Sequence, residues 1–225
     1  MSNRFHHSGI RTLKIISLNV GRPREAVWMG KTVITGIFKE PVDGPRMLRT
    51  MNIEGDAQAD LSVHGGRHKA AYAYPSEHYD WWRAELPGVA LPRGMFGENF
   101  TTEGMTEETV CAGDRFRIGG ATVIVTQPRM PCYKLGLKFA RNDMAARFLR
   151  SGRTGFYMAV EEEGPVAPGD TVELLAADEA RVTIADLVRL YRGEETDDGL
   201  LRRALGVAAI PERWKNSLLE ELQGE

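Results

Sequence analysis

Short segments in which apolar and polar residues alternate recur through the first 177 residues. Leu13–Val20 is the first of them, and Gly21-Arg22-Pro23 ends it. Because successive side chains of a strand face opposite sides, such a pattern predicts eight to ten short strands. We therefore expect a mainly β fold, a barrel with short inserted helices. The other strand segments are 33–39, 47–51, 70–74, 155–161 and 172–175, with a hairpin around Gly119-Gly120 that joins 109–118 to 121–126.

Helical signals interrupt the strand pattern at two places in this region. Ser76 is the expected N-cap of a helix that ends at Pro87-Gly88. A second helix, over residues 144–149, begins after Asn142 or Asp143. Both are short, so they are expected to be insertions between strands and not a separate layer.

Beyond the strand region, apolar residues recur at helical spacing. The starts of three helical segments are marked by Thr183, by Asp197 or Asp198, and by Pro211. Three short helices in fewer than fifty residues predict a small C-terminal three-helix bundle. We therefore expect a β-barrel domain over residues 1–177 and a three-helix domain over residues 178–225.

Composition limits the partners and the compartment. A formal net charge of −2 over 225 residues gives no electrostatic reason to expect nucleic acid or an anionic membrane as a partner. Arginines in the C-terminal helices are offset by nearby acidic residues, so a docking tail for nucleic acid is the weakest alternative. The sequence contains no apolar run long enough to span a membrane, and its N-terminus lacks the apolar core of a signal peptide. Two cysteines suit a reducing compartment, and we expect a cytoplasmic protein.

Cys132 ends the most distinctive stretch of the chain, Gln127-Pro128-Arg129-Met130-Pro131-Cys132. Each proline locks φ and removes a backbone donor, so the bend is stiff. Arg129 and Lys134 lie close in sequence, and cationic neighbours favour the thiolate, which binds soft metals and attacks electrophiles. A buried structural cysteine is the alternative, and we favour it for Cys111, which has no cation beside it. We take Cys132 as the chemical centre of the protein.

Residues 52–69 show neither the alternation of a strand nor the apolar spacing of a helix, and they are rich in Gly, Asp and His. This pattern predicts a long functional loop. Its His64-Gly65-Gly66-Arg67-His68-Lys69 segment combines backbone donors and cations that suit an anion such as a phosphate, although a solvated loop would look the same. Lys31 is a mobile cation that can also meet a phosphate, and an ordinary surface lysine is the alternative. Asp56 is expected to hold the loop through backbone hydrogen bonds more readily than to act as an acid.

Several motifs of the barrel region occur together in a fixed order. They are Glu54-Gly55-Asp56, Gln58-Ala59-Asp60, Val63-His64-Gly65-Gly66, Phe96-Gly97-Glu98-Asn99-Phe100, Gly113-Asp114 and Gln127-Pro128-Arg129 with Pro131-Cys132. In this order they resemble the MOSC domain, which is found at the C-terminus of molybdenum cofactor sulfurases. The C-terminal helices resemble the three-helix appendage of the YiiM-like branch of that family.

The resemblance implies a barrel that binds the pterin-based molybdenum cofactor (molybdopterin). Cys132 matches the thiolate that ligates the metal in related proteins, and Lys31, His64 and Cys132 match the functional group proposed for the YiiM-like branch. His64 titrates near neutrality and is the expected proton donor. The implied cofactor-binding residues are Lys31, Thr32, His64, Gly65, Lys69, Asn99, Gln127 and Arg129.

The activity that the resemblance implies is the reduction of small N-hydroxylated compounds, including hydroxylaminopurines and amidoximes. The sequence has no dinucleotide fingerprint and too few cysteines for an iron–sulfur cluster of its own. Electrons are therefore expected from a separate flavin or iron–sulfur protein. The alternative is a non-catalytic carrier of the molybdenum cofactor or of a persulfide on Cys132.

Overall fold

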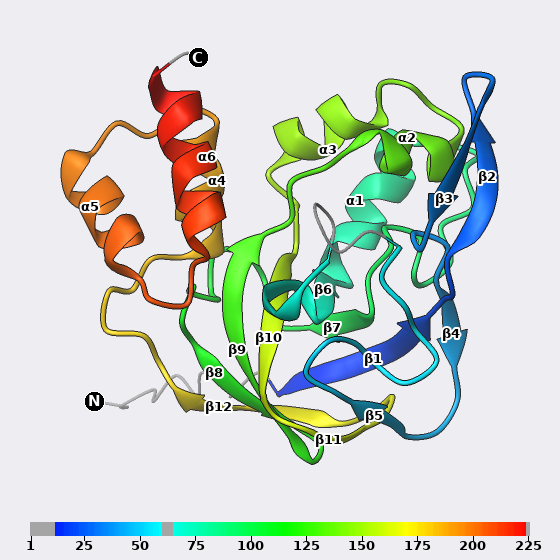
Figure 1. Ribbon diagram of the computed structural model, residues 1–225, viewed down its shortest axis with the longest axis horizontal. Helices are drawn as coiled ribbons and strands as arrows, with labels where there is room; N and C mark the ends of the chain where they lie inside the picture. Colours follow the sequence, from blue (N-terminus) through cyan, green and yellow to red (C-terminus); the bar gives the residue numbers. More distant parts are fainter. Residues whose placement is uncertain (1–11, 60–64, 224–225) are drawn as a thin grey trace, which may run out of the picture.

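Seven strands close into a barrel at the centre of the molecule (Figure 1). The computed structural model describes residues 12–59 and 65–223. Around the barrel the order is β12-β8-β9-β10-β6-β7-β1, and Leu13 of β1 pairs with Val172 of β12 to close it. Neighbouring strands are antiparallel except β6 and β7, which are parallel. The barrel strands are β1 (Leu13–Val20), β6 (Ala71–Pro75), β7 (Phe100–Glu103), β8 (Arg115–Ile118), β9 (Ala121–Pro128), β10 (Phe156–Glu162) and β12 (Thr171–Ala176).

Alternating side chains fill the inside of the barrel. On β8, Phe116 and Ile118 are buried while Arg115 and Arg117 are exposed, as the strand period requires. Buried apolar residues from the barrel strands form one cluster. The predicted mainly β barrel is confirmed, and the physical reason is the period-two pattern that gives each strand one apolar face.

Shorter strands lie outside the closed ring. β4 (Glu40–Val42) pairs with the C-terminal end of β1, and β5 (Arg46–Leu48) pairs with β11 (Gly164–Val166). None of these three strands exceeds three residues. β4 was not predicted, and the strand predicted over 47–51 overlaps β5, which ends at Leu48. Strands this short carry almost no periodic signal.

β2 (Arg24–Trp28) and β3 (Lys31–Thr35) form a separate hairpin. Met29 and Gly30 at its tip have positive φ values of 50° and 77°, the arrangement that matches the twist of two paired strands. The strand predicted over 33–39 corresponds to β3, but β3 begins at Lys31 and ends at Thr35. The strand over 24–28 was not predicted. β3 ends at Thr35 because the Thr35 hydroxyl accepts a hydrogen bond from the Ile37 backbone N–H (3.2 Å) and turns the chain.

Three short helices cover one end of the barrel (Figure 1). They are α1 (Glu77–Glu85), α2 (Tyr133–Phe139) and α3 (Met144–Ser151), and a 3-10 turn spans Arg67–Lys69. α1 and α3 are the predicted helices, but Ser76 and Asp143 stand at their starts with helical backbone angles and make no capping bond. α2 was not predicted, because its residues 134–137 are buried in succession and show no amphipathic period.

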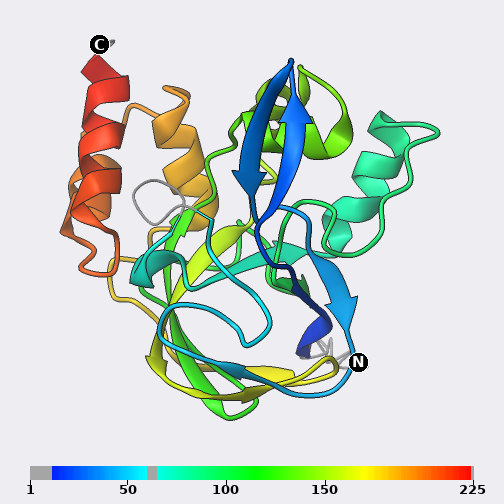
Figure 2. The same ribbon diagram turned by 45° about the vertical axis from the view of Figure 1, so that its right-hand side comes forward.

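The three C-terminal helices pack together beside the barrel (Figures 1 and 2). They are α4 (Ile184–Tyr191), α5 (Asp198–Gly206) and α6 (Glu212–Gln223). Thr183 and Asp186 form a reciprocal capping box at the start of α4, with hydrogen bonds of 3.0 and 2.9 Å. Buried residues of all three helices belong to the same apolar cluster as the barrel core. Within the described residues, no helix has the length and apolar content that crossing a bilayer requires.

Candidate functional site

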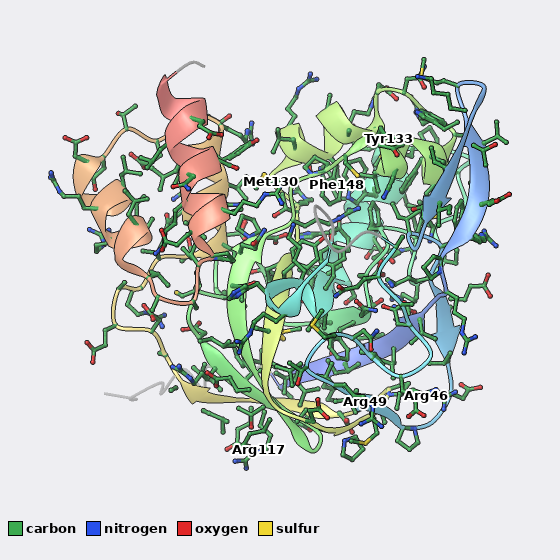
Figure 3. The ribbon with its side chains drawn as sticks, viewed as in Figure 1. Arg46, Arg49, Arg117, Met130, Tyr133 and Phe148 are labelled. Atoms are coloured by element: carbon green, nitrogen blue, oxygen red, sulfur yellow. The ribbon has the colours of Figure 1, made fainter. Side chains whose placement is uncertain are left out.

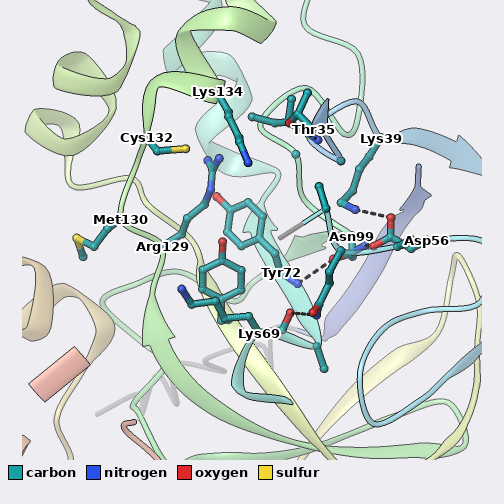
Figure 4. Close-up of a pocket in the computed structure, with 18 residues that line it drawn as sticks. Thr35, Lys39, Asp56, Lys69, Tyr72, Asn99, Arg129, Met130, Cys132 and Lys134 are labelled. Atoms are coloured by element: carbon teal, nitrogen blue, oxygen red, sulfur yellow. Dashed lines mark hydrogen bonds and ion pairs between the residues drawn. The ribbon is translucent and has the colours of Figure 1, made fainter. Parts of the chain in front are cut away.

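A pocket lies beside the start of α2, where segments far apart in the sequence meet (Figure 4). The barrel supplies rigid walls through β6 and β10, and loops supply the remaining side chains. This is the usual construction of a binding site, in which a stable scaffold positions loop residues. The lining comes from residues 35–39, 56–59, 69–72, 97–99, 129–134 and Tyr157.

Cys132 lies on the connection between β9 and α2 and lines this pocket. Its side chain is half-buried and its backbone is extended, with φ −135° and ψ 174°. In Figure 4 the thiol lies over the Arg129 guanidinium, on the same side of the pocket as Lys134. Cys111, in contrast, is fully buried away from the pocket, and burial raises the pKa of its thiol to about 11. Cys132 is therefore the thiol that a ligand in the pocket can reach.

The charged lining of the pocket is predominantly cationic. Among the residues that the structure describes, Lys39, Lys69, Arg129 and Lys134 line it, against the single carboxylate of Asp56. Cations confined in a partly closed cleft attract anions more strongly than the same charges do on an open surface. The pocket is thus electrostatically suited to an anionic ligand.

Arg129 is the cation whose surroundings point most directly to a ligand. Its side chain is 6% exposed, and its guanidinium carbon lies 5.0 Å from the centre of the Tyr72 ring and 5.4 Å from that of Phe148. Among the described residues, Nη1 of Arg129 has no hydrogen-bond partner. A buried donor without a partner is costly, so a bound acceptor would stabilise this arrangement.

Lys39, Asp56 and Asn99 form a buried network at the opposite side of the pocket (Figure 4). Asp56 accepts hydrogen bonds from Lys39 Nζ (2.5 Å), Asn99 Nδ2 (2.9 Å) and the Gly21 backbone N–H (3.0 Å). Burial lowers the pKa of Lys39, and the attraction of Asp56 opposes that shift. Asp56 therefore holds the loop in place, as its sequence context suggested, and its oxygens are already engaged.

Lys69 and Lys138 carry perturbed ammonium groups near the pocket. Burial lowers the pKa of Lys69, and the nearby Arg213 lowers it further. Burial also lowers the pKa of Lys138 to about 8. Lys138 Nζ donates to the backbone oxygens of Ile37 (3.0 Å) and Gly94 (2.7 Å), so it fixes the segment over 35–39 to the opposite loop.

The Phe96-Gly97-Glu98-Asn99-Phe100 motif is a structural support of the pocket. Glu98 is fully buried and accepts hydrogen bonds from the backbone N–H groups of Gly94 (2.8 Å) and Phe96 (3.1 Å). The Asn99 side chain binds the backbone of Tyr72 and of Asn19, besides Asp56. Both side chains thus satisfy backbone groups, as polar residues in tight turns commonly do.

The structure brings some of the predicted site residues together. Cys132, Arg129, Lys69 and Asn99 line one pocket. Gly65 does not line it, and Gln127, though buried on β9, does not line it either. His64 lies outside the described residues.

Lys31 and Thr32 are both exposed on the β2–β3 hairpin and do not line the pocket. The structure therefore does not bring Lys31 together with Cys132, contrary to the sequence-based expectation. The reason is that β3 points its N-terminal end outward and reaches the pocket only at Thr35, where the strand ends.

Lys39, Tyr72 and Lys134 are among the lining residues that were absent from the sequence-based set of catalytic and cofactor-binding residues. Lys39 and Tyr72 gave no local signal, because the first ends an apolar run and the second lies within a buried strand. Lys134 stands two residues after Cys132, and that spacing is the one clue the sequence offered.

Among the described residues, no group of three or more His, Cys, Asp or Glu side chains is placed to hold a metal ion. A metal in this pocket would therefore need most of its ligands from a cofactor, with Cys132 as a soft protein ligand. The cationic lining and the unpartnered Nη1 of Arg129 fit a cofactor that carries a phosphate. The residues present thus fit a phosphorylated pterin that carries a soft metal.

Comparison with known proteins agrees with this fold. A family model described as the MOSC domain matches residues 60–173, and a model described as the YiiM-like, 3-alpha helix domain matches residues 182–224. The crystal structure of YiiM from Geobacillus stearothermophilus has a TM-score of 0.78 at 32% identity, over 93% of this chain and 99% of that one. YiiM from Escherichia coli has a TM-score of 0.71 at 32% identity, over 90% of this chain and 94% of that one. The chain therefore belongs to the MOSC-domain family, in its YiiM-like branch.

Curated relatives extend this result. The uncharacterized protein YflK of Bacillus subtilis is 42% identical over 92% of this chain and 93% of its own length. Protein YiiM of Escherichia coli is 37% identical over 82% of this chain and 83% of its own length. A protein named reductase from Gibberella moniliformis is 32% identical over 83% of this chain, which corresponds to 34% of that protein. The predicted domain boundary between residues 177 and 178 stays a prediction, because one family model ends at residue 173 and the other begins at residue 182.

Proposed function

We propose that this protein is a molybdenum-cofactor-dependent reductase of small N-hydroxylated compounds. The observation that carries the proposal is the cationic pocket lined by both Cys132 and the buried Arg129, whose Nη1 has no hydrogen-bond partner among the described residues. Membership of the MOSC family and a relative named reductase support it.

The residues of the pocket have separable roles in this proposal. Cys132 supplies a thiolate to the metal, and Arg129, Lys69 and Lys134 bind the phosphate of the pterin. The bound cofactor supplies two-electron redox chemistry, which side chains cannot perform. His64 is the proposed proton donor.

The overall reaction determines how many electrons and protons the substrate must receive. Reduction of an N–OH compound to an N–H compound breaks one N–O bond, consumes two electrons and two protons, and releases the oxygen as water. With two cysteines and no dinucleotide fingerprint in this sequence, the electrons come from a separate flavin or iron–sulfur protein in this proposal.

Replacement of Cys132 tests the proposed function. Protein from a host that makes the cofactor should carry near-stoichiometric molybdenum and release an oxidised, fluorescent pterin. Removal of a hydrogen-bond partner of a metal ligand lowers metal affinity or activity about 10- to 100-fold. Replacement of the ligand itself should have a larger effect, so Cys132→Ser should lower the rate of reduction of N-hydroxylated compounds at least about 100-fold. Metal analysis and a steady-state assay with a reduced viologen dye provide the measurements.

Cys111→Ala is the matched control, because Cys111 lies outside the pocket, and it should retain both metal and activity. Wild-type protein without molybdenum or pterin would refute the cofactor. Cofactor binding without steady-state turnover would instead favour the carrier.

A further inference from the structure

Glu107 is a buried carboxylate that does not line the pocket. It lies between β7 and β8 and is 1% exposed. Its Oε1 accepts a hydrogen bond from the Gly155 backbone N–H (2.6 Å), and its Oε2 lies 2.6 Å from Nε2 of His78 on α1. Burial of an ionisable group is costly unless its polar atoms have partners, and both oxygens of Glu107 have one. Glu107 therefore joins α1 to the segment that precedes β10.

Thr154 and Gly155, which precede β10, hold two components of the pocket, and we call them the 154–155 segment. The Gly155 backbone oxygen accepts a hydrogen bond from the Arg129 backbone N–H (3.3 Å). The Thr154 backbone oxygen accepts one from the Tyr72 hydroxyl (2.7 Å). The Arg129 guanidinium carbon lies 5.0 Å from the centre of the Tyr72 ring (Figure 4). The 154–155 segment therefore fixes both the Arg129 backbone and the ring that lies beside its guanidinium.

The 154–155 segment lies against β6 and outside the strand pairing of the barrel. Gly155 has a φ of 60°, and a Cβ there would lie 2.3 Å from the Ala73 backbone oxygen. The pairing of β10 with β6 and β9 begins at Phe156, so the barrel ladder provides no acceptor for the Gly155 N–H. A buried N–H group needs an acceptor, and Glu107 supplies it. The position of the segment therefore depends on the Glu107 carboxylate.

The C-terminal helices hold Glu107 from its other side. The Glu107 backbone oxygen accepts a hydrogen bond from the Ala185 N–H (2.9 Å), and the Val110 backbone oxygen accepts one from the Ile184 N–H (2.9 Å). Ala185 and Ile184 form the start of α4, where backbone N–H groups have no acceptor within the helix. The segment that carries Glu107 thus satisfies the start of α4, and hydrogen bonds connect the three-helix bundle to Arg129 through Glu107.

We propose that Glu107 is a positioning residue, which holds the 154–155 segment so that the Arg129 guanidinium is oriented for an anion before the anion binds. The inference rests on the proposed function for the identity of that anion, the phosphate of the cofactor. The guanidinium lies beside Tyr72 and 5.4 Å from the ring of Phe148, at the end of the barrel that the short helices cover (Figure 3). A donor fixed in advance loses less conformational freedom on binding, so the anion binds more tightly.

Binding of inorganic phosphate tests the positioning role without reference to activity. Phosphate is titrated by calorimetry into full-length protein from a host that cannot make the cofactor, so that the pocket is free. Glu107→Leu should weaken phosphate binding about tenfold, because it leaves the Gly155 N–H without an acceptor and releases the segment that holds Arg129. Glu107→Gln should restore the affinity to within about threefold of wild type, because its amide oxygen can still accept from Gly155 and its amide nitrogen can donate to His78.

Asp114→Leu is the matched control for loss of a buried carboxylate. Asp114 is 2% exposed and accepts hydrogen bonds from the backbone N–H groups of Cys111 (2.9 Å) and Asp178 (2.9 Å), away from the pocket. The melting temperatures of both variants should fall, whereas Asp114→Leu should keep the phosphate affinity within about twofold. Equal weakening of phosphate binding by the two variants, unchanged binding by Glu107→Leu, or no binding by the wild type would overturn the positioning role.

Tyr72→Phe tests the second contact of the 154–155 segment and serves if Glu107→Leu does not fold. It removes only the hydroxyl that Thr154 accepts, so phosphate binding should weaken about threefold, and unchanged affinity would overturn the proposal. The proposed function is judged separately by metal analysis and the viologen assay. Wild-type protein without molybdenum refutes the function alone, whereas a phosphate affinity insensitive to Glu107→Leu refutes only the positioning role.

Discussion

Asp56 connects the loop over residues 56–59 to the barrel through buried polar contacts. It accepts hydrogen bonds from a lysine, an amide side chain and a backbone N–H, and its side chain is 4% exposed in the pair with Lys39. A buried cation that loses its counterion is strongly destabilising, whereas most surface pairs contribute little. The pocket therefore depends on Asp56 for its shape and not for its reactivity.

Asp56→Asn should lower the free energy of unfolding by about 3 kcal/mol, because it leaves the Lys39 ammonium buried without a counterion. Urea denaturation followed by fluorescence measures the change. Asp143→Asn, on an exposed carboxylate paired with Arg141 and Arg147, is the control and should leave the free energy of unfolding nearly unchanged. A loss at Asp56 as small as that at Asp143 would show that the network does not support the fold.

At the scale of elements, the decisive contact is the one between α2 and the β2–β3 hairpin. An isolated two-stranded hairpin is only marginally stable in water, so its position depends on the surface that it packs on. Gly136 provides that surface, because any Cβ there would lie 2.7 Å from the Arg141 carbonyl oxygen and 3.3 Å from Trp28.

Gly136→Ala should destabilise the protein by about 1–3 kcal/mol and displace the hairpin, because the added methyl group overfills the contact. Calorimetric melting gives the stability. The sequence has four tryptophans, so the part of the fluorescence that Trp28→Phe removes reports the displacement. Gly206→Ala on α5 is the matched control: a Cβ there meets nothing within 4 Å, so stability should stay the same or rise by up to about 1 kcal/mol. If Gly136→Ala left the stability unchanged, the position of the hairpin would not depend on its contact with α2.

At the scale of the whole molecule, the three-helix bundle and the barrel share one apolar cluster. Leu187 of α4 is fully buried in it, together with barrel residues such as Val125 and Phe116. Parts of a protein that share a core unfold together, whereas parts with separate cores unfold independently.

Leu187→Ala should cost about 2–5 kcal/mol and lower the protection of amides in both the barrel and the helices. Native-state hydrogen exchange resolves the two groups of amides. Leu201→Ala on α5 is a control, because that side chain is only partly buried and should cost less. Loss of protection confined to the helices would show two independent folding units.

Much of the architecture follows from local patterns. The strand over Leu13–Val20 and the three C-terminal helices were predictable, since a period of two or of 3.6 gives each segment its apolar face. The α2 helix and the strand over Arg24–Trp28 were not, because packing against the rest of the protein stabilises them more than their own pattern does.

The sequence by itself determined the barrel class, the C-terminal helices and Cys132 as the candidate centre, because periodicity, stiff prolines and cationic neighbours are local properties. Only the tertiary structure decided which cations from distant segments accompany the thiol. It places Lys39 and Lys69 at the pocket beside the local Arg129 and Lys134, and it leaves Lys31 on the exposed hairpin. The physical reason is that a pocket is closed by segments distant in the chain, and the separation between them is set by strand pairing and packing, which no local pattern records.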